Sequence, residues 1–230
     1  MSIIASLAII FLSAFCYSFL ALELGDYILL SRSVRGRFPK RKVPMFECSF
    51  ILGILFAVII LLFLISFLLS LFGPLPSDFL MYICSFLIVL SFLLLFVYYR
   101  RNNSTELWLP RKFSRHLAFL ARRISLRRDA FLFGILTITY ELPFSLILFV
   151  IAVFSMMKLS GFSLVIGFIL FLFVTIFPVF LAKSLQKSGF TIAKLQKWRT
   201  ENNLFFRILS SFSFLVLALF LLTCEMGAFL

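Results

Sequence analysis

Apolar residues fill six long stretches of the chain, and polar residues are concentrated in the connections between them. Strand-like alternation of apolar and polar positions is absent from all six. Each stretch has at least the roughly 20 residues that a helix needs to cross a bilayer. Helices also satisfy their backbone groups within the segment, as lipid requires. The pattern therefore predicts an all-α, polytopic membrane protein with six transmembrane helices. These are expected at 3–30, 48–72, 77–99, 130–155, 160–182 and 204–229.

Basic residues gather on alternate connections between these stretches. If Arg207 at the start of the last span is included, three connections contain all 22 Lys and Arg residues except Lys158. They are 31–47, 100–129 and 183–203. Positive residues are retained on the cytoplasmic side of a membrane, so both termini are expected outside. The two short connections, 73–76 and 156–159, are predicted to be tight outer hairpins.

Composition strengthens the membrane interpretation. Hydrophobic residues make up 63% of the chain, against about 45–50% in a soluble domain. No cleavable signal peptide is evident, so we expect the first stretch to remain as a span. The size and the lack of a targeting segment favour an integral, multi-pass protein of a bacterial cytoplasmic membrane. The net charge of +13 is explained by the topology and gives no indication of nucleic-acid binding.

The six predicted spans divide into two groups of three with a similar order of long and short connections. An odd number of spans per repeat forces the second copy to insert upside down. Inverted repeats of this kind place substrate sites near the midplane, where the halves meet. We therefore expect a single transmembrane domain, 1–230, built from inverted repeats at 1–99 and 130–230. A basic cytoplasmic linker at 100–129 would join them.

Part of this linker has an amphipathic pattern. Residues 111–128 place apolar side chains at helical spacing among basic ones; these are Phe113, Leu117, Leu120 and Ile124. One interpretation is a helix that lies on anionic lipid at the membrane surface. The other is a surface on which a protein partner docks. The pattern is compatible with both.

Three acidic residues lie within the predicted spans. Glu23 and Asp26 are three residues apart, about one helical turn, and so share a face. Glu141 lies near the middle of the fourth stretch, about 16 Å from its cytoplasmic end at the helical rise. Acids inside a membrane are costly and are by default functional. Gly25 and Pro143 beside them would open the helix and free backbone carbonyls as further ligands.

A cation or a proton is the expected partner of these three carboxylates, because no Lys or Arg lies deep within a span. Acidic oxygen ligands suit hard ions such as manganese, calcium or magnesium. The alternatives are that Arg32 or Arg35 neutralises Glu23 and Asp26, and that Glu141 makes a structural hydrogen bond. The remaining acids are interpreted as interfacial, solvated or helix-capping groups. They are Glu47, Asp78, Glu106, Asp129, Glu201 and Glu225.

Other chemistry has little support in the sequence. The four cysteines are scattered without a Cys-x-x-Cys pair, and the only histidine, His116, lies in a basic connection. A haem or zinc site is therefore not expected. No Walker sequence, nucleophile elbow or Gly-rich fingerprint occurs. We expect neither an enzyme nor a resident cofactor.

Residues 19–26, Phe-Leu-Ala-Leu-Glu-Leu-Gly-Asp, resemble the start of the Glu-x-Gly-Asp signature of a cation/proton exchanger family. This family includes Golgi manganese and calcium transporters and is related to the lysine-exporter superfamily. The resemblance implies that Glu23 and Asp26 bind a cation and that Glu141 is the second-half counterpart of Glu23. Tyr27 and the following residue replace the basic and hydroxyl residues of the motif. In the second half, Pro143 and its neighbour replace Gly and Asp.

The leading hypothesis from the sequence is a secondary transporter that exchanges a divalent cation, manganese or calcium, against protons. Its site would contain Glu23, Asp26 and Glu141. One alternative is a non-catalytic membrane subunit or assembly factor of a larger complex, and another is an exporter of amino acids or other small metabolites. The expected partners are the lipid bilayer, anionic lipids at the basic connections, and either further copies of the chain or a larger membrane complex.

Overall fold

The computed structural model describes most of the chain. The described residues are 3–20, 23–39, 41–71, 82–83, 85–90, 111–187, 194, 197 and 201–226. Within these ranges only the backbone is described for residues 19–20, 23–25, 111–115, 143–144, 187, 203–207, 210 and 225–226. The side chains of Glu23 and Pro143 are therefore outside the described part.

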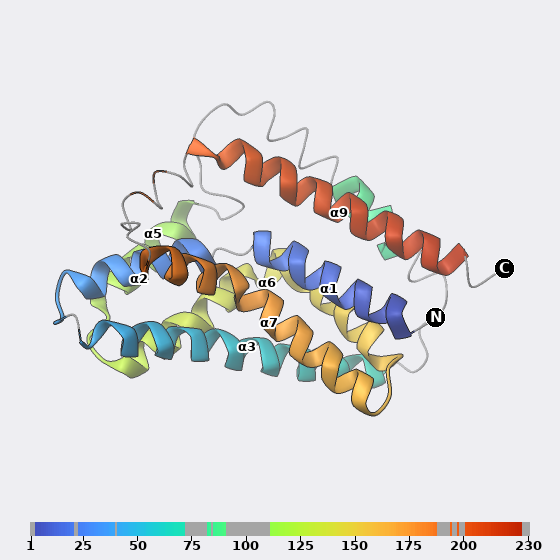
Figure 1. Ribbon diagram of the computed structural model, residues 1–230, viewed down its shortest axis with the longest axis horizontal. Coiled ribbons are helices and arrows are strands. Elements are labelled where there is room, and N and C mark those ends of the chain that lie inside the picture. The colour runs from blue at the N-terminus through green and yellow to red at the C-terminus, as the bar shows by residue number, and fades with distance from the viewer. Residues whose placement is uncertain are drawn as a thin grey trace.

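The described secondary structure is entirely helical, as the apolar pattern predicts, and no strand occurs in the described residues. Figure 1 shows the arrangement of the helices. They are α1 (Ile3–Leu20), α2 (Glu23–Arg35), α3 (Val43–Leu71), α5 (Arg111–Arg123), α6 (Arg127–Met157), α7 (Phe162–Lys187) and α9 (Asn203–Met226).

Two of these helices, α3 and α7, are long and apolar enough to cross a membrane. At the helical rise the 29 residues of α3 extend about 44 Å, well beyond a hydrocarbon core of about 30 Å. Helix α6 is a third span if its two halves are counted together. The described residues thus contain two or three candidate spans, where the sequence pattern predicts six. The two inverted repeats are not evident in them.

Parts of the first half lie outside the described residues. In the first stretch, 3–30, helices α1 and α2 are described on either side of residues 21–22, which are outside the described part. The hairpin at 73–76 and most of the third stretch, 77–99, also lie outside it. The linker at 100–129 contains helix α5 and the first turn of α6.

Successive helices run back and forth along one axis (Figure 1). Helices α1 and α2 follow each other in one direction, α3 returns, and α6 and α7 form a second antiparallel pair. Helices α6 and α7 are joined by a tight connection in which Gly161 has a φ of 56°. This left-handed conformation favours glycine, and the connection is as short as the sequence predicts.

Helices α3 and α6 form the most extensive helix pair of the described structure. A Cβ atom added to Gly53 would lie 2.1 Å from the carbonyl oxygen of Phe131, and one added to Gly134 would lie 2.4 Å from that of Phe50. Glycine at both positions therefore lets the two backbones touch. This contact sets the position of the α6 segment that follows Gly134.

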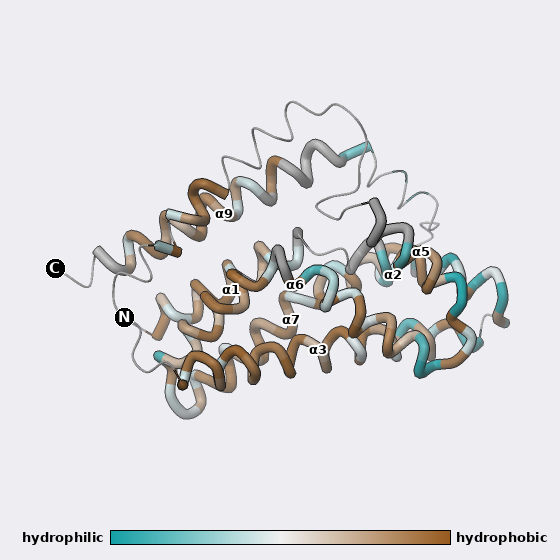
Figure 2. Tube along the Cα trace, turned by 180° about the vertical axis from the view of Figure 1, so that it is seen from behind, coloured by the Kyte–Doolittle hydropathy of each residue, from teal (hydrophilic) through white to brown (hydrophobic). Residues whose placement is uncertain are grey.

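Hydrophilic residues collect at one end of the molecule (Figure 2), where α2 ends, α3 and α6 begin and α7 ends. We call this the basic end; among its exposed residues are Arg35, Arg37, Arg41, Arg122, Arg123 and Arg128. The rest of the surface exposes large apolar side chains. Phe63 is 66% exposed and Phe162 80% exposed. A surface of this kind is typical of helices surrounded by lipid rather than water.

Candidate functional site

Helix α6 carries two polar side chains one turn apart, Thr137 and Glu141. Because residues at i and i+4 share a helix face, both side chains lie on the same face of α6. Both are buried, with 0% of Thr137 and 5% of Glu141 exposed. Each contacts a different partner helix, α2 for Thr137 and α1 for Glu141.

The first contact joins Asp26 on α2 to Thr137. The Thr137 Oγ1 atom lies 2.9 Å from Asp26 Oδ2, and Asp26 is only 4% exposed. The same Oγ1 atom lies 3.0 Å from the carbonyl oxygen of Phe133, one turn earlier in α6. A hydroxyl group has a single hydrogen. Thr137 therefore lies between two acceptors and can donate to only one of them at a time.

The second contact joins Tyr17 on α1 to Glu141. The Tyr17 hydroxyl donates to Glu141 Oε2 at 3.0 Å, and Tyr17 is completely buried. Its ring packs edge-on against Phe149, with 5.1 Å between the centroids. This contact is a structural hydrogen bond of the kind considered as the alternative for Glu141, and its donor comes from the neighbouring helix α1.

Glu141 lies where α6 bends. The halves Arg127–Leu142 and Ser145–Met157 are inclined by 94° to one another. Pro143 at the bend has no backbone N–H and cannot continue the helical ladder. The Ser145 Oγ atom donates to the Glu141 carbonyl oxygen at 3.1 Å and so links the two halves. Glu141 thus lies near the end of the first half, where its side chain contacts Tyr17.

Of the predicted site residues, Asp26 and Glu141 are thus brought to one face of α6. Glu23 and Gly25 belong to the first turn of α2, but their side chains are outside the described part, as is that of Pro143. Among the described side chains, no group of three His, Cys, Asp or Glu residues lies close enough together to hold a metal ion. A third carboxylate at the site therefore stays a prediction.

Glu47 was expected to be a solvated or capping charge, and this expectation is wrong. Glu47 is 3% exposed and lies in the second turn of α3. Ser31 Oγ donates to Glu47 Oε1 at 3.1 Å, and Arg35 Nη2 lies 3.4 Å from the same atom. Lys183 Nζ lies 3.9 Å from Oε2. A buried carboxylate requires such partners.

The sequence contains a signal for this burial. Val43, Phe46 and Phe50 recur at helical spacing and form the buried face of the start of α3, and Glu47 lies on the same face. The helix begins five residues earlier than the predicted span, which moves Glu47 from a connection into a helix. Arg35 consequently contacts Glu47 and Gln186. Arg35 is one of the two arginines expected to neutralise Asp26, and it pairs with Glu47 instead.

Asp129 does cap a helix, as expected. Its Oδ2 atom accepts hydrogen bonds from the backbone N–H groups of Leu126, at 2.8 Å, and Ser125, at 3.0 Å. These groups precede the first turn of α6 and lack helical partners. Asp129 therefore belongs to the start of the helix and takes no part in the site.

The amphipathic helix α5 uses part of its apolar face within the molecule. Leu117, Ala121 and Ile124 are at most 4% exposed, and Ser33 Oγ on α2 donates to the Ala121 carbonyl oxygen at 2.7 Å. Phe119 remains 48% exposed, with the Arg123 guanidinium 4.2 Å from its ring centroid. The described part of α5 thus packs against α2 and leaves a narrower apolar surface for lipid or a partner than the sequence pattern suggests.

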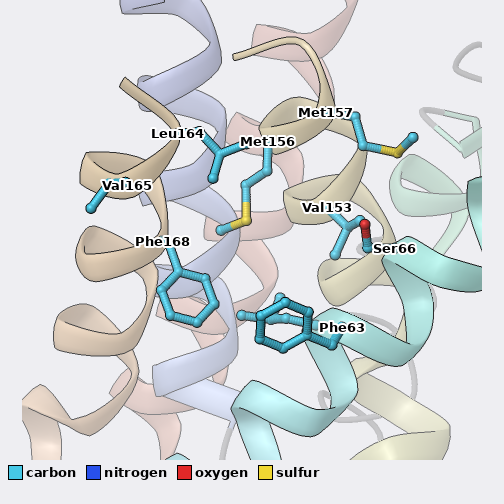
Figure 3. Close-up of a pocket in the computed structure, with 9 residues that line it drawn as sticks. Phe63, Ser66, Val153, Met156, Met157, Leu164, Val165 and Phe168 are labelled. Atoms are coloured by element: carbon cyan, nitrogen blue, oxygen red, sulfur yellow. The ribbon is translucent and has the colours of Figure 1, made fainter. Parts of the chain in front are cut away.

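An apolar pocket of about 260 Å³ lies away from these polar groups, between α3, α6 and α7 (Figure 3). Met156 and Phe168 point into it, and Ser66 is its one polar lining residue. No carboxylate lines it. Its chemistry suits a hydrocarbon group, and it is separate from the Asp26 and Glu141 contacts.

No protein-family model, curated protein or solved structure matches the chain.

Proposed function

We propose that the chain is a multi-pass membrane transporter that exchanges a divalent cation, manganese or calcium, for protons at Asp26 and Glu141. The observation that carries this proposal is the position of the Thr137 hydroxyl, 2.9 Å from Asp26 Oδ2 and 3.0 Å from the Phe133 carbonyl oxygen. The buried Glu141 carboxylate, one turn further along α6, belongs to the same site.

The Thr137 geometry accommodates both proton states of Asp26. When Asp26 is ionised, the Thr137 hydroxyl donates to it. When Asp26 is protonated, its own O–H donates to Thr137 Oγ1, and the Thr137 hydrogen turns to the Phe133 carbonyl, a bond that threonines in helices commonly make. Neither state leaves the hydroxyl unsatisfied, so a proton is added or removed without breaking the α2–α6 contact.

The same groups provide ligands for a hard cation. Carboxylate and hydroxyl oxygens are the ligands that calcium, magnesium and manganese prefer. Asp26, Glu141, Thr137 and Tyr17 supply such oxygens from three helices, and Glu23 at the start of α2 would add another. When one divalent ion replaces two carboxyl protons, the total charge of the site stays the same. Exchange therefore avoids leaving an uncompensated charge in a buried site.

The test is transport by the purified chain in liposomes loaded with a manganese-sensitive dye, with a pH gradient as the driving force. Asp26→Asn and Glu141→Gln keep hydrogen-bonding groups of similar shape but cannot exchange protons. We expect each to reduce manganese uptake by at least about tenfold, because each removes an essential acid of the site. Glu201→Gln is the control, because that exposed residue pairs only with Lys197 in the described structure.

Wild-type uptake rates in both Asp26→Asn and Glu141→Gln would contradict the assignment. If the wild-type chain transports no manganese or calcium and purifies with a stoichiometric membrane partner, the subunit alternative replaces the transporter. Size-exclusion profiles matching the wild type exclude misfolding as the cause of a loss.

A further inference from the structure

A second polar group lies at the basic end, beyond Asp26 along α2, and the proposed transport site does not use it. It consists of residues from α2, α3 and α7, which we call the Glu47 cluster: Tyr27, Ser31, Arg35, Glu47, Lys183 and Gln186. Three of them, Tyr27, Ser31 and Arg35, recur every four residues and so share one face of α2. Arg35 lies nine residues beyond Asp26, or about 13 Å along the helix.

Glu47 is the centre of this cluster. Its side chain is 4% exposed, whereas those of Arg35 and Lys183 are 44% and 29% exposed. The two cations thus cover a buried carboxylate from the solvent side, and Arg35 also donates to Gln186 Oε1 on α7. Glu47 therefore connects the three helices at the basic end.

The cluster is not fully satisfied. The Tyr27 hydroxyl and Gln186 Nε2 are buried and have no hydrogen-bond partner in the described part of the chain. Tyr27 as a whole is 0% exposed, and its hydroxyl lies beside the side chains of Glu47 and Gln186 without the geometry of a full hydrogen bond to either. Buried polar groups without partners raise the free energy of the packed state. The free-energy difference that favours the closed arrangement over an open one is consequently smaller than it would be in a fully hydrogen-bonded network.

We propose that the Glu47 cluster is the closure of the transport site on the basic end, and that it opens when Glu47 separates from Arg35 and Lys183. The inference rests on the proposed function, and it assigns Glu47 a role in gating. Separation would free α7 from α2 and α3 at this end and hydrate the path to Asp26. Solvent would then reach the Thr137 side of α6, which is completely buried in the closed arrangement.

The accessibility of position 137 to a labelling reagent tests the proposed opening without a measurement of transport. Thr137→Cys is introduced into the full chain after the four native cysteines are changed to serine. The protein is reconstituted in liposomes, and a membrane-impermeant maleimide is added on the side of the α2–α3 connection. With Glu47→Gln we expect labelling about tenfold faster, since a shift of about 1.4 kcal/mol toward the open form suffices for that factor.

Glu201→Gln is the matched control, because it removes the carboxylate of the other ion pair of the described structure, Lys197–Glu201, which is exposed. The double variant Arg35→Gln with Lys183→Gln should accelerate labelling as Glu47→Gln does, and provides a second route if Glu47→Gln fails to fold. Each variant is checked for full labelling after denaturation.

Equal labelling rates with and without the Glu47 or Arg35/Lys183 changes would overturn the closure and identify the cluster as a fixed structural ion pair. That result is independent of whether Asp26→Asn abolishes uptake. Faster labelling in a chain that transports no cation would instead contradict the transport function and leave a cluster that opens.

Discussion

At the scale of single residues, three carboxylates are buried in the described structure, and the sequence predicts two of them. Asp26 and Glu141 are found from their positions within apolar stretches, and both are buried. Glu47 is missed because its burial depends on where α3 begins. The partner hydroxyls are also not apparent from the sequence: Thr137 lies on the helix of Glu141, yet its side chain contacts Asp26 from another helix.

The Thr137 contact predicts a specific stability difference. Thr137→Val keeps the side-chain volume but removes the hydroxyl, which leaves Asp26 without this bond. We expect the free energy of unfolding to fall by about 1 kcal/mol, the usual net contribution of one hydrogen bond. Unfolding in detergent measures it. Thr139→Val is the control, because the exposed Thr139 bonds only the Ile135 carbonyl in the described structure. Equal losses in both variants would show that the Asp26 contact contributes nothing.

At the scale of elements, the crossing of α3 and α6 determines which side chains meet. Gly53 and Gly134 allow backbone contact, and the α6 turn after Gly134 then brings Thr137 to α2 and Glu141 to α1. The bend at Pro143 redirects the second half of α6. The sequence shows where glycine and proline occur in these stretches, but only packing shows that Gly53 faces α6 and Gly134 faces α3.

This crossing predicts that Gly53→Ala and Gly134→Ala are strongly destabilising. The added Cβ atoms would lie 2.1 and 2.4 Å from backbone oxygens, which cannot rotate away as side chains do. The helices would have to separate, at a cost of about 1–3 kcal/mol or more. Gly36→Ala is the control, because its Cβ would meet its nearest atom at an ordinary 3.6 Å. Thermal unfolding in detergent distinguishes them, and a similar melting temperature in all three variants would refute the close contact.

At the scale of the whole molecule, charge is separated along the long axis. The basic end contains the exposed arginines of α2, α5 and α6, while the opposite end contains the α6–α7 turn with Lys158 (Figure 2). The same separation is predicted from the charges of alternate connections. It supports an orientation in which the basic end faces the cytoplasm.

This orientation predicts opposite labelling of two exposed positions, Arg41→Cys at the basic end and Ser160→Cys in the α6–α7 turn, each in a chain without other cysteines. In intact cells, an impermeant maleimide should modify the cysteine at position 160 and leave the one at position 41 unmodified. Inverted membrane vesicles should give the reverse. Labelling of both positions from the same side would exclude a membrane between the two ends, and the reverse pattern would exclude a cytoplasmic basic end.

The sequence by itself determined the helical class, the segregation of positive charge and the positions of two buried acids. These depend on local composition and on helical spacing, which need no knowledge of neighbouring elements. Tertiary structure alone decided that Glu47 is buried and that Thr137 meets Asp26. Each of these depends on which face of one helix packs against another. That choice is made by contacts between residues far apart in the chain, such as the close approach of Gly53 and Gly134.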